Sequence, residues 1–122
     1  MEDLIELLEK ATEGSRELDA LVGLACGAIP KKKNIYKARR HPPQLVRVDE
    51  VWPAFTTSVD AALTLVPDGM HKHMGDEYGD NRGGASWARI FPPHNQRNGT
   101  GNQWARTLPL ALCIATLRAR GK

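Results

Sequence analysis

Four stretches of the chain repeat apolar residues at helical spacing, and this pattern limits the possible fold more than any other feature. The stretches cover residues 3–11, 18–25, 59–66 and 110–117, and each predicts a helix with one buried stripe. Capping residues and helix terminators bound the last three: Ser15 and Gly27, Thr57 with Asp60 and then Pro67, and Thr107 and Gly121. Each stripe needs a partner surface to cover it, so the helices must pack around a common core.

Between the helices, short runs of β-branched and aromatic residues predict three strands, at 45–48, 70–78 and 85–91. The turn-rich stretch 79–84 joins the last two strands, which indicates a hairpin. A small sheet covers its faces by packing against helices. We therefore expect an α/β or α+β fold, in which a small antiparallel or mixed sheet packs between helices as a single-domain sandwich spanning 1–122.

Size and composition agree with one such domain. The chain has 122 residues, of which 41% are hydrophobic and 25% are charged, as in ordinary globular proteins. No stretch approaches the ~20 apolar residues of a membrane-spanning helix, and the chain begins with an acidic segment instead of a signal peptide. We expect a cytoplasmic protein that has no membrane partner.

Two segments have no apolar period, and we expect both to be loops. The first, 30–43, is a basic loop bounded by Pro30 and Pro43. The second, 92–103, is polar and rich in glycine and proline, which is typical of a long flexible loop.

Charge is distributed unevenly along the chain, although the formal net charge is only +3. Residues 2–19 hold seven acidic and two basic side chains, whereas residues 31–47 hold seven basic side chains and none that are acidic. Such polarity indicates a binding surface for phosphate or for an acidic partner. The alternative is that the two segments are solvated or complement each other.

Three blocks of sequence resemble a known family. They are Arg16-Glu17-Leu18-Asp19-Ala20-Leu21, the block from Trp52 to Pro67 around Thr56-Thr57-Ser58-Val59-Asp60-Ala61-Ala62, and the block from Thr107 to Ala119. Together with a tryptophan-containing β-region, they resemble the phage alpha-beta-alpha sandwich domain family of small phage and prophage proteins. The resemblance covers most of the chain and implies a fold and a phage origin more than an activity, because the matching residues are mainly packing residues.

No motif predicts catalysis, and we expect neither an enzyme nor a cofactor. Cys26 and Cys113 lie in apolar helical patterns, which favours buried thiols. His71 and His73 share one face of a predicted strand and could ligate a metal in a metal-dependent enzyme, but no spacing supplies further ligands. The glycine-rich stretch 79–84 lacks the lysine and hydroxyl of a phosphate-binding loop.

The candidate binding residues are basic and aromatic. In the basic segment, Tyr36 lies among cations, an arrangement that single-stranded nucleic acids favour. Its candidates are Lys31, Lys32, Lys33, Tyr36, Lys37, Arg39 and Arg40. Arg82, Arg89 and Arg97 could form a pocket for a phosphorylated ligand. Trp52 and Trp87 are expected in the core, and Trp104, between a polar loop and the last helix, is a candidate for recognition.

We therefore expect a non-enzymatic binding protein of phage or prophage origin in the cytoplasm of a bacterial host. The favoured role is an inhibitor of a bacterial defence system, of the anti-CRISPR type, that contacts a host or phage protein such as a CRISPR effector subunit. This step is an analogy at the level of fold and origin. The alternatives are a nucleotide or phosphorylated small-molecule binder that sequesters a signal, and a weak nucleic-acid binder.

Overall fold

A computed structural model describes residues 2–37, 44–76, 86–93 and 99–120 of the protein. Four helices and five strands follow one another along the chain. They are α1 (Glu2–Lys10), α2 (Arg16–Cys26), β1 (Lys31–Lys37), β2 (Gln44–Val51), α3 (Val59–Leu63), β3 (His71–Asp76), β4 (Ser86–Phe91), β5 (Gln103–Ala105) and α4 (Leu108–Arg120). Both sheets are antiparallel, which confirms the expected α+β class.

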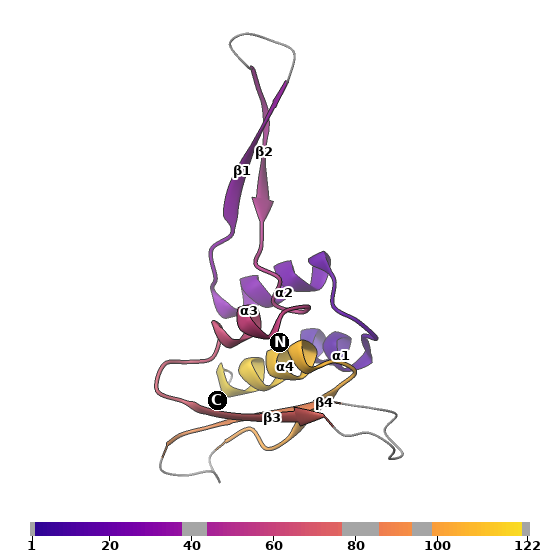
Figure 1. Cartoon of the computed structure of the whole chain (residues 1–122), viewed down its shortest axis with the longest axis vertical. Coiled ribbons are helices and arrows are strands. Elements are labelled where there is room, and N and C mark those ends of the chain that lie inside the picture. Colours follow the sequence, from indigo (N-terminus) through magenta and orange to yellow (C-terminus); the bar gives the residue numbers. More distant parts are fainter. Residues whose placement is uncertain (1, 38–43, 77–85, 94–98, 121–122) are drawn as a thin grey trace.

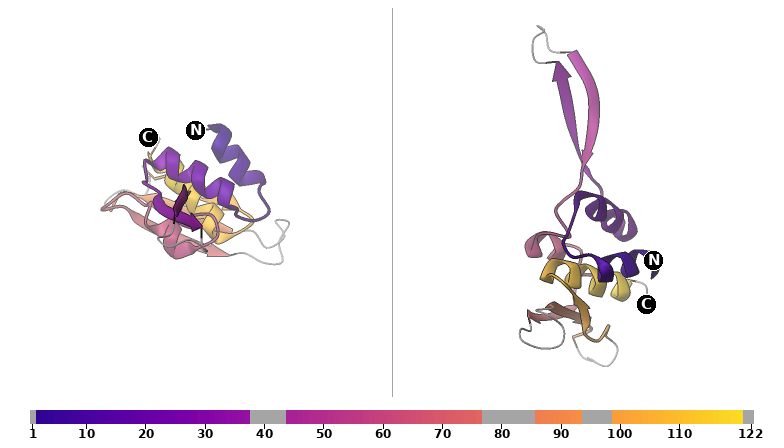
Figure 2. Two further views of the ribbon diagram at one scale, coloured as in Figure 1. Left: turned by 90° about the horizontal axis from the view of Figure 1, so that it is seen from above. Right: turned by 90° about the vertical axis from the view of Figure 1, so that its right-hand side faces the viewer.

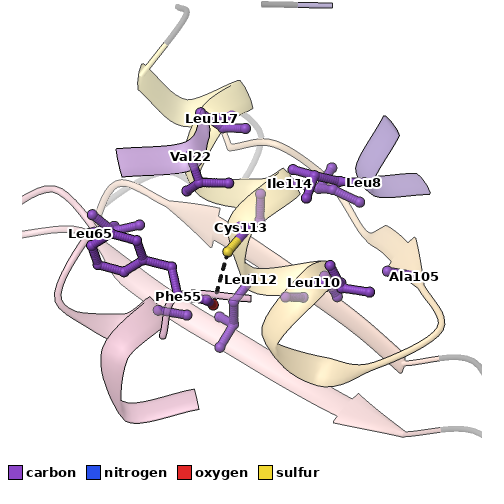
Figure 3. Packing of buried hydrophobic residues seen from close by; sticks show 14 of the residues in the cluster. Leu8, Val22, Phe55, Leu65, Ala105, Leu110, Leu112, Cys113, Ile114 and Leu117 are labelled. Carbon is purple, nitrogen blue, oxygen red and sulfur yellow. Dashed lines mark hydrogen bonds between the residues drawn. The ribbon is translucent and has the colours of Figure 1, made fainter. Parts of the chain in front are cut away.

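Helix α4 is the centre of the molecule. Its residues Leu110 to Leu117 are all buried, because it contacts the three-stranded sheet β3-β4-β5 and all three other helices. Figure 3 shows the apolar side chains of α4 packed among Leu8 of α1, Val22 of α2 and Phe55. The sequence predicted one apolar stripe on this helix. Instead, side chains are buried on every side of this helix, as is typical of a helix that other elements cover all around.

The layers are arranged with α4 in the middle. The three-stranded sheet lies along one side of α4, and α2 lies on the other side (Figure 1 and Figure 2). Among the described helices, α4 contacts all three strands of this sheet, and α1 contacts β5. The sequence predicted a sheet packed between helices. In the structure, helix α4 lies instead between the sheet and α2 (Figure 1).

Helix α2 begins and ends as the sequence predicts, whereas α1 covers Glu2–Lys10 instead of the predicted 3–11. The Ser15 hydroxyl accepts a hydrogen bond from the Leu18 backbone N–H at 3.1 Å and caps α2. Gly27 ends the helix with a positive φ of 73°, which a glycine adopts without steric cost. Arg118 of α4 pairs with Glu9 of α1 at 3.3 Å, which links the first helix to the central one.

Helix α3 differs from the prediction at both ends. Ser58 rather than Thr57 is its cap, since the Ser58 hydroxyl accepts from the Ala61 N–H. The regular helix ends at Leu63, and residues 64–66 continue in tighter turns bonded from residue i+3 to i. Pro67 explains this early end, because a residue before proline is disfavoured in the helical conformation.

The predicted basic loop 30–43 was wrong for Lys31–Lys37, which form strand β1 and pair with β2. Backbone hydrogen bonds define this pairing, and neither strand contacts another described helix or strand. A strand that faces no core needs no apolar alternation, so the periodicity that marks a buried strand is missing. The predicted strand at 45–48 is confirmed and is longer than expected.

The predicted flexible loop 92–103 was also wrong at its far end. Gln103 begins strand β5, and before it Thr100 bonds to Ile90 of β4 in both directions, with N–O distances of 2.9 and 3.1 Å. The predicted hairpin of β3 and β4 is confirmed. Among the described helices, none is long and apolar enough to cross a membrane.

Candidate functional site

Strands β1 and β2 form a two-stranded ribbon that projects from the body of the molecule (Figure 1 and Figure 2). We call residues 31–37 and 44–51 the ribbon. The register pairs Lys31 with Val51 at the base and Lys37 with Gln44 at the far end. An irregularity between Ile35 and Tyr36 gives β2 one extra residue, and such a bulge bends and twists a strand pair.

Charge is unbalanced along the ribbon. At the base, Lys32 lies opposite Glu50 and Lys33 opposite Asp49, so each lysine has an acidic register partner. At the far end, Lys37 and Arg47 have no acidic residue opposite them. The connecting sequence adds the predicted residues Arg39 and Arg40, which lie outside the described residues. Apart from Lys31, which lies opposite Val51 at the base, the described basic residues without an acidic register partner therefore belong to the distal half of the ribbon.

The ribbon separates this positive charge from the acidic helices. A strand of seven residues spans roughly 23 Å at ~3.3 Å per residue. Exposed charges in physiological salt are screened over about 8 Å. The acidic side chains of α1 belong to the body, beyond the base of the ribbon (Figure 1). These acidic side chains therefore repel an anionic ligand at the far end of the ribbon only weakly.

The base of the ribbon is anchored where β2 returns to the body. The Arg16 guanidinium donates to the Trp52 carbonyl at 2.8 Å and to Asp19 Oδ2 at 3.2 Å. Trp52 lies against Gly23 of α2 so closely that a Cβ there would collide with its ring. These contacts hold the chain at the foot of β2 against α2.

An open hollow of about 380 Å³ lies beside this anchor. Its lining combines Arg16, Glu17, Ala20, Glu50 and Trp52. The two carboxylates disfavour an anionic ligand, and the guanidinium of Arg16 is already engaged. We assign no ligand to the hollow.

The other predicted binding residues lie at the opposite end of the molecule from the ribbon tip. Arg89 is in β4 and Trp104 is in β5, both half-buried. Arg82 and Arg97 lie outside the described residues, so Arg89 is the one residue of the predicted arginine pocket that the structure describes. Arg89 Nη2 donates to His73 Nδ1 at 2.9 Å, because a guanidinium can only donate.

His71 and His73 are exposed on β3, and both contact the Phe91 ring, with ring centroids 5.7 and 5.0 Å apart. His73 Nδ1 is occupied by Arg89. Within residues 2–37, 44–76, 86–93 and 99–120, no three His, Cys, Asp or Glu side chains are grouped closely enough to hold a metal ion.

Both cysteines are free thiols, and their surroundings disfavour nucleophilic chemistry. Burial raises the pKa of Cys113 to about 12, and its thiol donates to the Phe55 carbonyl at 3.2 Å (Figure 3). Cys26, predicted to be buried, is half-buried, and its partial burial raises its pKa as well. A thiolate is the reactive form, so neither residue is poised for attack at neutral pH.

Sequence reasoning missed the surroundings of Arg89. Trp87 was expected in the core, yet it is half-buried beside Arg89, and Phe91 was not considered. The signal was the alternation within Ser86–Phe91, in which small or aliphatic residues alternate with Trp87, Arg89 and Phe91. Such a strand has one face for the core and a second face with aromatic and cationic side chains.

The fold and the ribbon define a small α+β protein with a projecting basic arm. No family model matches the chain, and neither a curated protein nor a solved structure matches it. The resemblance to the phage alpha-beta-alpha sandwich domain family therefore stays a prediction from the sequence.

Proposed function

We propose that this protein is a non-enzymatic nucleic-acid-binding protein and that its ribbon docks on a duplex. One observation carries the proposal: the sequence from 31 to 47 holds seven basic side chains and no acidic ones, and its described residues, 31–37 and 44–47, lie in a ribbon that contacts no other described helix or strand. A projecting arm with this charge is suited to bind an anionic partner.

The shape of the ribbon fits this partner. The major groove of DNA admits a two-stranded β-ribbon, and several proteins read DNA with such strands. The distal half carries Lys37 and Arg47 on opposite strands, and lysine and arginine are residues that contact the phosphates of a duplex. Tyr36 next to Lys37 adds an aromatic side chain to the same strand.

The energetics of the ribbon also favour a partner. An isolated two-stranded hairpin is marginally stable in water, and this one receives no support from the core. Contacts with phosphates would stabilise it, because neutralising phosphates with lysine and arginine releases condensed counterions. The cost of ordering the arm would then be offset by electrostatic binding.

Affinity for a fluorescent 20-base-pair duplex, measured by anisotropy at several salt concentrations, tests the proposal. If four to seven phosphates are neutralised, the logarithm of the association constant falls with the logarithm of salt with a slope of about −4 to −6. Replacing Lys37→Gln and Arg47→Gln together should reduce this slope by about 1.8.

A matched control removes the same charge from the body. Lys10 and Lys72 are exposed and lie outside the ribbon, so the pair Lys10→Gln and Lys72→Gln should leave the slope nearly unchanged. Equal losses in both double variants would mean that net charge alone attracts the duplex, and the ribbon would lose its assigned role.

A protein partner is the second candidate, and exposed apolar residues at the base of the ribbon favour it. Leu24 is 67% exposed and Ile29 is 88% exposed, and Ile29 is separated from the start of β1 by Pro30 alone. An acidic protein with an apolar patch would match both surfaces. This partner corresponds to the expected phage inhibitor of a bacterial defence system, acting in the host cytoplasm.

The two candidates separate in a pull-down from bacterial lysate treated with nuclease. Recovery of one stoichiometric protein that is lost in a Leu24→Ser and Ile29→Ser variant supports the protein partner. Loss of all co-purifying material on nuclease treatment supports the nucleic acid.

A further inference from the structure

The three-stranded sheet has an outer face that no described helix covers. Ser86, Ala88 and Ile90 of β4 are buried, so the alternate residues Trp87, Arg89 and Phe91 belong to the opposite face, where Trp87 and Arg89 are half-buried and Phe91 is buried. Register partners share a face of a sheet, which adds three positions of β3 and one of β5. They are His71, His73, Gly75 and Trp104.

The cationic part of this outer face is a connected cluster. Arg89 Nη2 donates to His73 Nδ1 at 2.9 Å, and the Arg89 guanidinium lies 5.7 Å from the centroid of the Phe91 ring. His73 meets the same ring edge to face, with centroids 5.0 Å apart. These contacts hold Arg89 in one orientation next to exposed imidazoles, so its charge is fixed at the centre of the face.

The aromatic part lies beside it. Trp87 is the register partner of both Gly75 and Trp104, so two indoles occupy adjacent strands. A Cβ at Gly75 would lie 3.0 to 3.1 Å from three atoms of the Trp87 indole, which shows that this ring lies across the bare backbone of β3. Glycine at this position therefore lets the indole lie along the sheet.

Charge and ring chemistry together identify the ligand. None of the described residues assigned to this face is acidic, and the face combines two indoles with one oriented guanidinium. Nucleic-acid bases stack on aromatic side chains while cations contact the backbone, and this combination binds single strands with little sequence preference. An acidic peptide would use the guanidinium but offers no base to stack on an indole.

We propose that the outer face of the three-stranded sheet binds single-stranded nucleic acid, with bases on Trp87 and Trp104 and a phosphate on Arg89. This site is separate from the ribbon, which leaves the body from the side opposite the sheet (Figure 1). It does not depend on the function proposed for the ribbon.

Intrinsic fluorescence tests the proposal, because the chain has three tryptophans and Trp52 lies at the foot of the ribbon, away from the sheet. An eight-nucleotide thymidylate strand is titrated into the wild type, Trp52→Phe, and the double variant Trp87→Phe with Trp104→Phe. Quenching should persist in Trp52→Phe and disappear in the double variant. Persistent quenching in the double variant, or none in the wild type, would overturn the proposal.

Affinity measurements with the same thymidylate oligonucleotide separate the contribution of base stacking from that of the phosphate contact. Trp104→Leu should weaken binding about 5- to 160-fold, which corresponds to the roughly 1–3 kcal/mol lost when a stacking aromatic is removed. Arg89→Gln should weaken it and reduce its salt dependence, whereas Lys37→Gln with Arg47→Gln, in the ribbon, should leave the quenching unchanged. An eight-unit polyphosphate or an oligoglutamate peptide that competes as well as the thymidylate strand would refute base stacking.

Discussion

Replacing Asp19 with alanine should destabilise the protein more than most single substitutions, although Asp19 lies far from both proposed binding surfaces. The Asp19 side chain is fully buried. Its Oδ1 accepts the Thr56 backbone N–H at 2.8 Å and the Thr56 hydroxyl at 2.5 Å. These two bonds join α2 to the segment between the ribbon and α3.

The expected loss follows from these bonds. In Asp19→Ala, the Thr56 hydroxyl can still donate to the Ser15 carbonyl, 3.1 Å away, but the buried Thr56 N–H has no other acceptor in the described structure. An unsatisfied buried donor costs about 1–3 kcal/mol, and the hydrogen bond to a charged group contributes about 1.5–3 kcal/mol. We therefore expect a loss of about 3–4 kcal/mol. Arg16 adds little, because its side chain is 63% exposed.

Urea unfolding followed by circular dichroism measures this loss. Asp19→Asn keeps an acceptor at Oδ1 and should cost less than Asp19→Ala, which separates the acceptor from the charge. Asp3→Ala, at an exposed site in α1, provides the control and should change the free energy of unfolding by less than about 0.5 kcal/mol. A loss below about 1 kcal/mol in Asp19→Ala would refute the reasoning.

Three further predictions concern the core and the ribbon. Gly23→Ala should cost about 1–3 kcal/mol in thermal unfolding, because its Cβ collides with Trp52, and an unchanged Tm would contradict the close contact. Burial raises the pKa of Cys113 to about 12, so the folded state keeps a proton that the unfolded state releases near pH 9. The free energy of unfolding should fall above pH 9 by up to about 1.4 kcal/mol per pH unit, and Cys113→Ala should show a shallower fall. Replacing residues 31–51 by two glycines should change stability by less than about 1 kcal/mol, since the ribbon contacts no other described element; a loss above about 2 kcal/mol would place it in the core.

The sequence predicted the parts of the fold that depend on local signals. Ser15 and Gly27 were identified as the ends of α2 because capping and positive φ are chemical requirements of those positions. Burial around α4 was underestimated, because the number of neighbours of a helix depends on tertiary packing. The helical repeat did, however, reveal that Leu110 and Leu117 face the core.

The binding surfaces were only partly predictable. The basic character of residues 31–37 was visible, but their strand was not, because a ribbon without a core leaves no apolar period in the sequence. Arg89 and Trp104 were selected from the sequence as binding candidates, and both are half-buried in the structure, whereas Trp87 was assigned to the core and is half-buried as well. The alternation within Ser86–Phe91 places Trp87 on the outer face of the sheet, and its pairing with Gly75 and Trp104, which the structure alone gives, shows which residues share that face.

Backbone amide shifts measured by NMR during titration with a DNA duplex test the central claim most directly. In a chain of 122 residues, each amide reports separately on its own surroundings. The account predicts that the largest shifts fall in residues 31–37 and 44–51 and increase toward Lys37 and Arg47, while α1 and α4 stay unchanged. Shifts that spare the ribbon, or no shifts at all at saturating duplex and low salt, would contradict it.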